Sequence, residues 1–221
     1  MGKLYYVPII HHVDFGSMML LALHKGKGAL AKHLGTVDQF EDMLQERIPQ
    51  FISDCGQDLS KLTIRVDGLV NGTIDPYWGV KKRSIDCDEA LAICKEAAEA
   101  GSKVHKIVLG LCSLGARVHG TEDPDIISLW NGLARDCELD DATTKELIID
   151  RDQFIAKSIS HIGSSGKSAL CFMGAAHNVP LRLQQREVVF DLVHPITRKD
   201  VEDTIPGYLG LGTYFDKLPL R

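Results

Sequence analysis

The stretch Ala169-Leu170-Cys171-Phe172-Met173, followed by Gly174-Ala175-Ala176-His177-Asn178, decides the fold class of this chain. Five consecutive apolar residues that end at a glycine are typical of a strand buried on both faces of a sheet. Residues 4–10 form a second run of this kind, and it ends at His11. The two runs therefore predict two strands, each followed by a histidine.

Two further strands are expected between these two runs in the sequence, and one is expected after residues 169–173. They fall at residues 62–66, 116–119 and 187–193. Apolar residues at helical spacing predict helices between the strands. The expected helices are 18–34, with Ser17 as its cap, 38–53, capped by Thr36 or Asp38, then 86–100, 104–114, 125–136, 141–162 and 197–205. A strand over 106–111 is the alternative to the helix 104–114. Residues 71–84 are expected to be a loop.

The alternation of strands and helices predicts an α/β fold. We expect a single domain over residues 1–221, with a mainly parallel central sheet flanked by helices. A layout in two halves, about 1–115 and 116–221, is the alternative.

Composition excludes several classes of protein. The 221 residues are 44% hydrophobic and 25% charged, which is ordinary for a globular chain and excludes a disordered or collagen-like one. The net charge of -5, without a long basic block, predicts no nucleic-acid partner. No apolar run reaches the length of a membrane span, and the residues before the first strand lack the pattern of a signal peptide, so we expect neither a membrane span nor a leader. Six scattered cysteines without a Cys-x-x-Cys pair indicate reduced thiols and a cytoplasmic location.

Polar side chains follow four of the expected strands. These are His11 with Asp14, Asp67, Glu122, and His177 with Asn178. Ligands of open α/β sheets bind at the carboxyl ends of the strands, so these groups are candidates for one site. Two imidazoles with several carboxylates are the ligand set of a divalent metal in a hydrolytic site. The competing interpretation is that such residues only form turns and helix caps.

Two further candidates lie on the long helix 141–162. Asp150-Arg151-Asp152 stands among apolar residues there, and Arg151 could pair with Asp152, since an arginine can hold a carboxylate through two hydrogen bonds. A solvated helix face is the alternative.

The segment Gly166-Lys167-Ser168 ends like a phosphate-binding P-loop. The first glycine of that pattern is replaced by His161, and the segment precedes a strand where a P-loop would join a strand to a helix. We therefore interpret it as a turn.

Two motifs in the second half of the chain resemble the TraB and Tiki proteins. These are the helix that carries Asp150-Arg151-Asp152 and the strand that ends Gly174-Ala175-Ala176-His177. The erythromycin esterase and haem-binding ChaN-like proteins are placed in the same superfamily, and the layout of the chain also resembles a group of prokaryotic proteins without an established activity. The resemblance implies an α/β fold and metal-assisted hydrolysis. His11 matches the histidine of the first family motif, whose glycine is replaced here.

The sequence leaves two main hypotheses. In the first, a metal-dependent hydrolase of a peptide, ester or small amide, the metal ligands are His11, His177, Asp14 and Asp67. Glu122 is then the general base, Arg151 and Asp152 assist, and Ser17 and Asn178 bind the substrate. In the second, the same residues hold a metal, a haem or a metabolite without turnover. A metal-free acid–base enzyme is a third alternative, and homo-oligomerisation stays open.

Overall fold

The computed structural model describes residues 2–10, 27–69, 73–75, 79–81, 86–135, 140–174, 177–188 and 190–206. Within these residues the main sheet is built from β1 (Lys3–Ile9), β2 (Leu62–Val66), β5 (Arg117–His119), β6 (Ser168–Gly174) and β7 (Asp191–Val193), and β3 (Thr73–Asp75) pairs with β4 (Gly79–Lys81) in a hairpin. The described helices are α2 (Lys27–Asp54), the 3-10 turn η1 (Leu59–Lys61), α3 (Cys87–Glu99), α4 (Lys103–Ser113), α5 (Pro124–Arg135), α6 (Asp141–Ser164), α7 (Val179–Gln185) and α8 (Arg198–Thr204).

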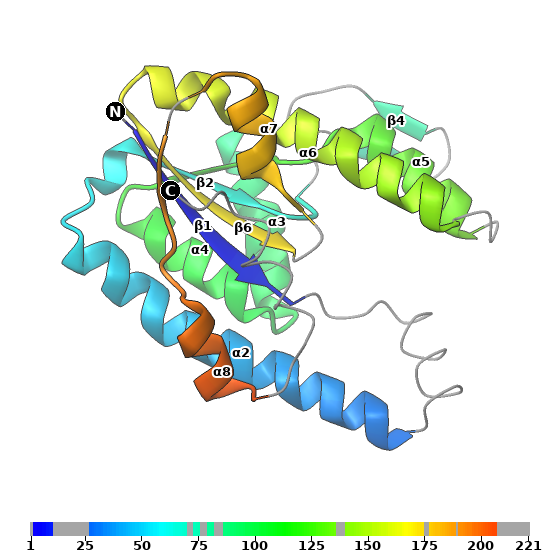
Figure 1. Cartoon of the computed structure of the whole chain (residues 1–221), viewed down its shortest axis with the longest axis horizontal. Helices are drawn as coiled ribbons and strands as arrows, with labels where there is room; N and C mark the ends of the chain where they lie inside the picture. Colours follow the sequence, from blue (N-terminus) through cyan, green and yellow to red (C-terminus); the bar gives the residue numbers. More distant parts are fainter. Residues whose placement is uncertain are drawn as a thin grey trace.

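The main sheet is parallel throughout and has the strand order β5-β2-β6-β1-β7 (Figure 1). The first described strand, β1, therefore lies between the last two described strands, β6 and β7. Every residue of β6 is buried, which fits a central strand covered on both faces. The fold class is thus the expected one, and the two ends of the described chain contribute to the same sheet, as in a single domain.

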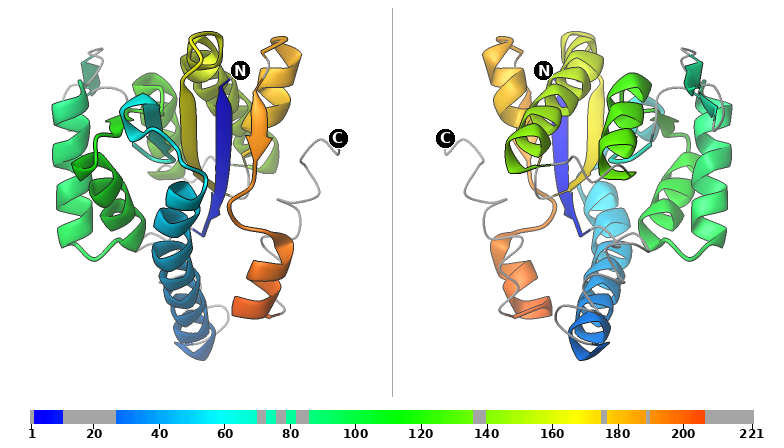
Figure 2. Two further views of the ribbon diagram at one scale, coloured as in Figure 1. Left: turned by 90° about the vertical axis from the view of Figure 1, so that its left-hand side faces the viewer. Right: turned by 90° about the vertical axis from the view of Figure 1, so that its right-hand side faces the viewer.

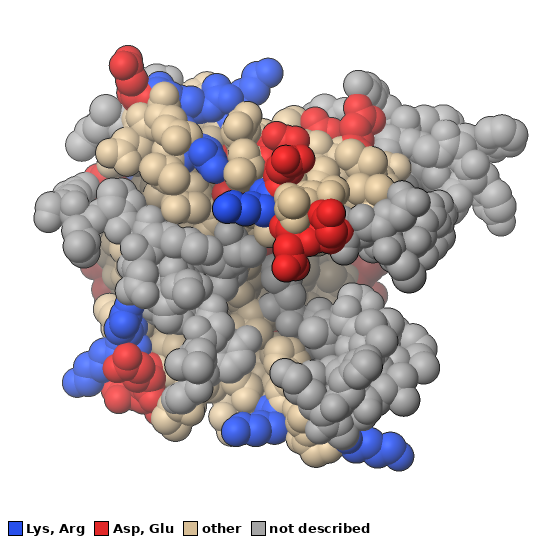
Figure 3. Space-filling view, turned by 45° about the vertical axis from the view of Figure 1, so that its right-hand side comes forward, with Lys and Arg blue, Asp and Glu red and all other residues tan. Residues whose placement is uncertain are grey.

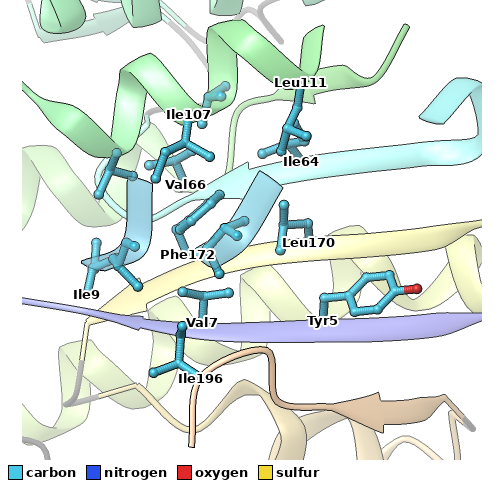
Figure 4. Close-up of a cluster of buried hydrophobic side chains, with 14 of the residues drawn as sticks. Tyr5, Val7, Ile9, Ile64, Val66, Ile107, Leu111, Leu170, Phe172 and Ile196 are labelled. Atoms are coloured by element: carbon cyan, nitrogen blue, oxygen red, sulfur yellow. The ribbon is translucent and has the colours of Figure 1, made fainter. Parts of the chain in front are cut away.

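Helices cover both faces of the sheet (Figure 2). Figure 4 shows the larger apolar cluster, in which Val7, Ile64 and Phe172 of the sheet pack with Ile107 and Leu111 of α4. Helices α2, α3 and α8 contribute to the same cluster. On the other face, Ile155, Ile159 and Ile162 of α6 and Val179 and Leu183 of α7 pack against β1 and β6. The result is a three-layer sandwich of helices, sheet and helices.

Local capping explains several helix starts. Asp86 accepts a hydrogen bond from the N–H of Glu89, whose side chain in turn accepts from the N–H of Asp86, so α3 begins at a capping box. Thr197 and Asp200 form the same motif at α8. Both helices lie where the sequence predicts them.

The prediction of two helices between 18 and 53 is wrong for the described part. Helix α2 continues from Lys27 to Asp54, and Thr36, an expected cap, donates its hydroxyl hydrogen bond to the carbonyl of Lys32 within the helix. The expected cap Ser17 and residues 18–26 lie outside the described residues.

Two other expectations need correction. Residues 179–185 form α7, which periodicity over so short a segment did not predict, and the expected strand 187–193 is reduced to β7. The expected loop 71–84 contains the short strands β3 and β4.

None of the described helices is long and apolar enough to cross a membrane. Figure 3 shows Lys and Arg together with Asp and Glu on one face, so the described surface in that view is not uniformly basic.

Candidate functional site

The side chains of Asp67, Glu122 and His177 meet where β2, β5 and β6 end. Asp67 directly follows β2, and its N–H donates to the carbonyl of Phe172 in β6 at 2.8 Å. The N–H groups of Thr121 and Glu122 both donate to the carbonyl of Leu69, at 2.7 and 3.1 Å. These bonds hold the segment after β5 beside the end of β2. The expected convergence of strand ends therefore occurs for Asp67, Glu122 and His177.

Helix α6 supplies a guanidinium between two of these side chains. Nη2 of Arg151 donates to Oδ1 of Asp67 at 2.7 Å and to Oε1 of Glu122 at 2.8 Å. Its Nε donates to Oε2 of Glu122 at 3.0 Å, so Glu122 is held through both oxygens. The guanidinium carbon also lies 5.5 Å from the centre of the Trp130 ring, a cation–π contact from α5.

His177 lies between two carboxylates. Its Nδ1 is 2.6 Å from Oδ1 of Asp152, and its Nε2 is 3.2 Å from Oδ2 of Asp67. The second oxygen of Asp152 accepts the backbone N–H of Asn178 at 2.8 Å, and Oδ2 of Asp67 accepts the N–H of Gly174 at 2.9 Å. Both carboxylates are thus fixed by backbone donors, and they fix the imidazole in turn.

Because the side chains around Asp67 are buried, the charge of each one strongly affects the pKa values of the others. The side chains of Asp67 and Glu122 are fully buried, and that of Arg151 is 12% exposed. Burial alone lowers the pKa of His177, but Asp67 and Asp152 outweigh it and raise the pKa to about 10. Burial raises the pKa of Glu122, an effect that Arg151 partly offsets. At neutral pH His177 is therefore a cation, and both it and Arg151 contact Asp67.

The donor set is suitable for a divalent cation. One ligand atom from each of Asp67, Glu122 and His177 lies within 4.8 Å of the others. Two carboxylates and one imidazole suit zinc and other first-row metals. Asp152 behind Nδ1 is the outer partner that a metal-binding histidine commonly has. A cation here would share Asp67 and Glu122 with Arg151, and carboxylates have lone pairs enough for both.

The structure brings five predicted residues into one network, which is Asp67, Glu122, Arg151, Asp152 and His177. The side chain of Asn178 accepts the N–H of Leu181 and caps α7, so its binding of a ligand stays a prediction. His11, Asp14 and Ser17 lie outside the described residues.

Sequence reasoning missed two contributors. Trp130 lies on α5, and its contact with Arg151 has no sequence signal because the two residues belong to different helices. The N–H of Gly174 was missed because a backbone donor to a distant carboxylate has no side-chain signature.

Comparisons of the chain with protein-family models, curated proteins and solved structures found no match. The resemblance to the TraB and Tiki proteins therefore stays a prediction.

Proposed function

We propose that the protein is a metal-dependent hydrolase whose divalent ion is held by Asp67, Glu122 and His177. The observation that carries the proposal is the meeting of these three donors at adjacent strand ends, with Asp152 oriented behind the histidine. Strand ends of parallel sheets are where α/β proteins bind their ligands.

Charge supports a cation at this place. Asp67, Glu122 and Asp152 are three buried acidic side chains, and Arg151 contacts two of them. A divalent ion would add positive charge beside this acidic cluster. Buried charges are stable only when they are compensated in this way.

The other residues have distinct roles in the proposed reaction. The bound ion would polarise a carbonyl and lower the pKa of a water molecule. Arg151, the most exposed of the five side chains, would face developing negative charge on the substrate. Asp152 would orient His177, and Asn178 would hold Asp152 through its N–H. A peptide, an ester or a small amide is the proposed substrate class.

Burial favours a second candidate, a metal-binding module without turnover. Asp67 and Glu122 have no solvent exposure, and a hydrolytic metal needs an open coordination position. In this candidate the ion links the strand ends and has no substrate.

Metal titration of the full chain tests the proposal. After chelation, we expect calorimetry to show about one equivalent of Zn²⁺ or Mn²⁺ bound, and the Glu122→Gln variant to bind at least about tenfold more weakly. Glu146→Gln is the matched control, since Glu146 is exposed on α6. Hydrolysis of ester, peptide and amide substrates would then depend on the added ion.

Two results would decide against the hydrolase. Failure of the wild-type chain to bind either ion, or equal binding by Glu122→Gln, overturns the metal site. Binding without hydrolysis of any of the three substrate classes leaves the metal-binding module.

A further inference from the structure

A second polar region lies on the α6 face of the sheet, beside the edge strand β5. It is a pocket of about 410 Å³. Thr63 and Arg65 of β2 pair with Arg117 and His119 of β5, so these four side chains project from one face of the sheet. The end of α6 and the turn before β6 close the pocket. None of its lining residues belongs to the Asp67 network.

The lining is strongly basic. No described Asp or Glu is among the lining residues, although Asp58 pairs with one of them, Lys61, at 3.0 Å. Ser60, Thr63 and Ser165 add hydroxyl groups. The basic side chains are Lys61, Arg65, Arg117, His119, His161 and Lys167.

Arg65 is the deepest of these groups. It is 6% exposed, and its guanidinium donates to the carbonyls of Gly120 and Ser158. Within the described part of the chain, its Nε has no hydrogen-bond partner and its guanidinium makes no ion pair with a carboxylate. A buried guanidinium that only carbonyls satisfy is costly, because its charge stays uncompensated. A bound anion would supply the missing charge.

The pKa of His119 is affected by the same positive charges. Burial first, and then the positive charges around the ring, lower the pKa of His119 to about 4. Those charges belong to Arg65, Arg117, His161 and Lys167, all of which line the pocket.

We propose that this pocket binds a small phosphorylated molecule through its phosphate group. Arg65 would contact the phosphate at the base of the pocket, and Arg117 and Lys167 would contact it from the exposed rim. Several cationic donors around one point suit a phosphate dianion better than a singly charged carboxylate. The volume leaves room for a small organic group beside it. Lys167 thus contributes to a phosphate site although Gly166-Lys167-Ser168 is not a P-loop.

Calorimetry with inorganic phosphate tests the proposal on the full chain, at constant ionic strength. We expect saturable binding of one phosphate and about tenfold weaker binding by Lys167→Ala. Lys157→Ala is the matched control, because Lys157 is exposed on α6 and does not line the pocket. Acetate should bind more weakly than phosphate.

A second variant tests the proposal even if Lys167 contributes little to phosphate affinity. Arg65→Met should abolish phosphate binding, and without phosphate it should unfold at the wild-type temperature or higher, since an uncompensated charge is removed. NMR should show that phosphate raises the pKa of His119 in the wild-type chain.

Three outcomes would overturn the proposal. They are no phosphate binding by the wild-type chain, equal loss of affinity in Lys167→Ala and Lys157→Ala, and much tighter binding of a DNA or RNA duplex than of phosphate. The last would indicate a nucleic-acid backbone as the ligand.

Discussion

Nδ1 of His177 lies 2.6 Å from Oδ1 of Asp152, and its other ring nitrogen is turned toward Asp67. The pair joins the segment after β6 to α6. It fixes which nitrogen of the imidazole is available to the strand-end carboxylates.

Replacing Asp152 by asparagine should weaken metal binding without removing a metal ligand. Because the carboxylate orients the ring and increases its basicity, we expect the affinity for Zn²⁺ to fall about 10- to 100-fold in Asp152→Asn. Competition with a coloured chelator measures the Zn²⁺ affinity of each variant. Asp150→Asn is the control, since Asp150 is exposed on the same helix. Unchanged affinity in Asp152→Asn would contradict the orienting role of the Asp152 carboxylate.

Replacing Arg151 by methionine should destabilise the metal-free protein. The change leaves Asp67 and Glu122 buried without their guanidinium partner, and we expect a loss of about 3–5 kcal/mol in urea unfolding. Adding Glu122→Gln to this variant should recover part of the loss, because the two side chains interact directly. Purely additive effects in the double mutant would contradict the buried ion pair.

Stability should fall in weak acid because of His119. The pKa of His119 is lowered from 6.5 to about 4 by burial and the surrounding cations. Above pH 6.5 neither the folded nor the unfolded form is protonated. Between pH 6.5 and 4 only the unfolded chain takes up this proton, so stability falls with pH and levels off below 4. The surrounding charged or titratable groups are Arg65, Arg117, His161, Lys167 and the thiol of Cys87, 3.5 Å from Nε2.

Urea unfolding between pH 4 and 7.5 measures this contribution. In His119→Gln the decline should be shallower than in the wild-type chain. An identical decline would show that other groups determine the acid sensitivity.

Continuity of α2 can be tested at Gly35. Its φ is not positive, and a methyl group there would meet no atom within 4 Å. Gly35→Ala should therefore stabilise the protein by about 0.5–1 kcal/mol. Gly68→Ala should instead destabilise it by about 1–2 kcal/mol, since Gly68 has a φ of +83°. Thermal unfolding of the two variants and of the wild-type chain measures both changes in stability. No gain from Gly35→Ala would favour two shorter helices.

Local sequence patterns were sufficient for much of the fold. The apolar runs that became β1 and β6 identified strands, and Asp86 and Thr197 marked helix starts. Patterns failed where the segment was short, as in α7, or where Thr36 or Asp38 was expected to cap a second helix, because α2 continues through both residues. A residue such as threonine lowers helix propensity by an amount that tertiary packing readily outweighs.

The sequence by itself determined an α/β chain with polar residues at its strand ends, because burial of apolar residues and helix capping act over a few neighbouring positions. Only the tertiary structure decided the strand order. This order, together with the packing of α6 on the sheet, brings Arg151 beside Asp67, although the two are 84 positions apart in the sequence. It also surrounds Arg65 with basic side chains. Such contacts depend on which strands pair over long distances, and no local periodicity encodes that choice.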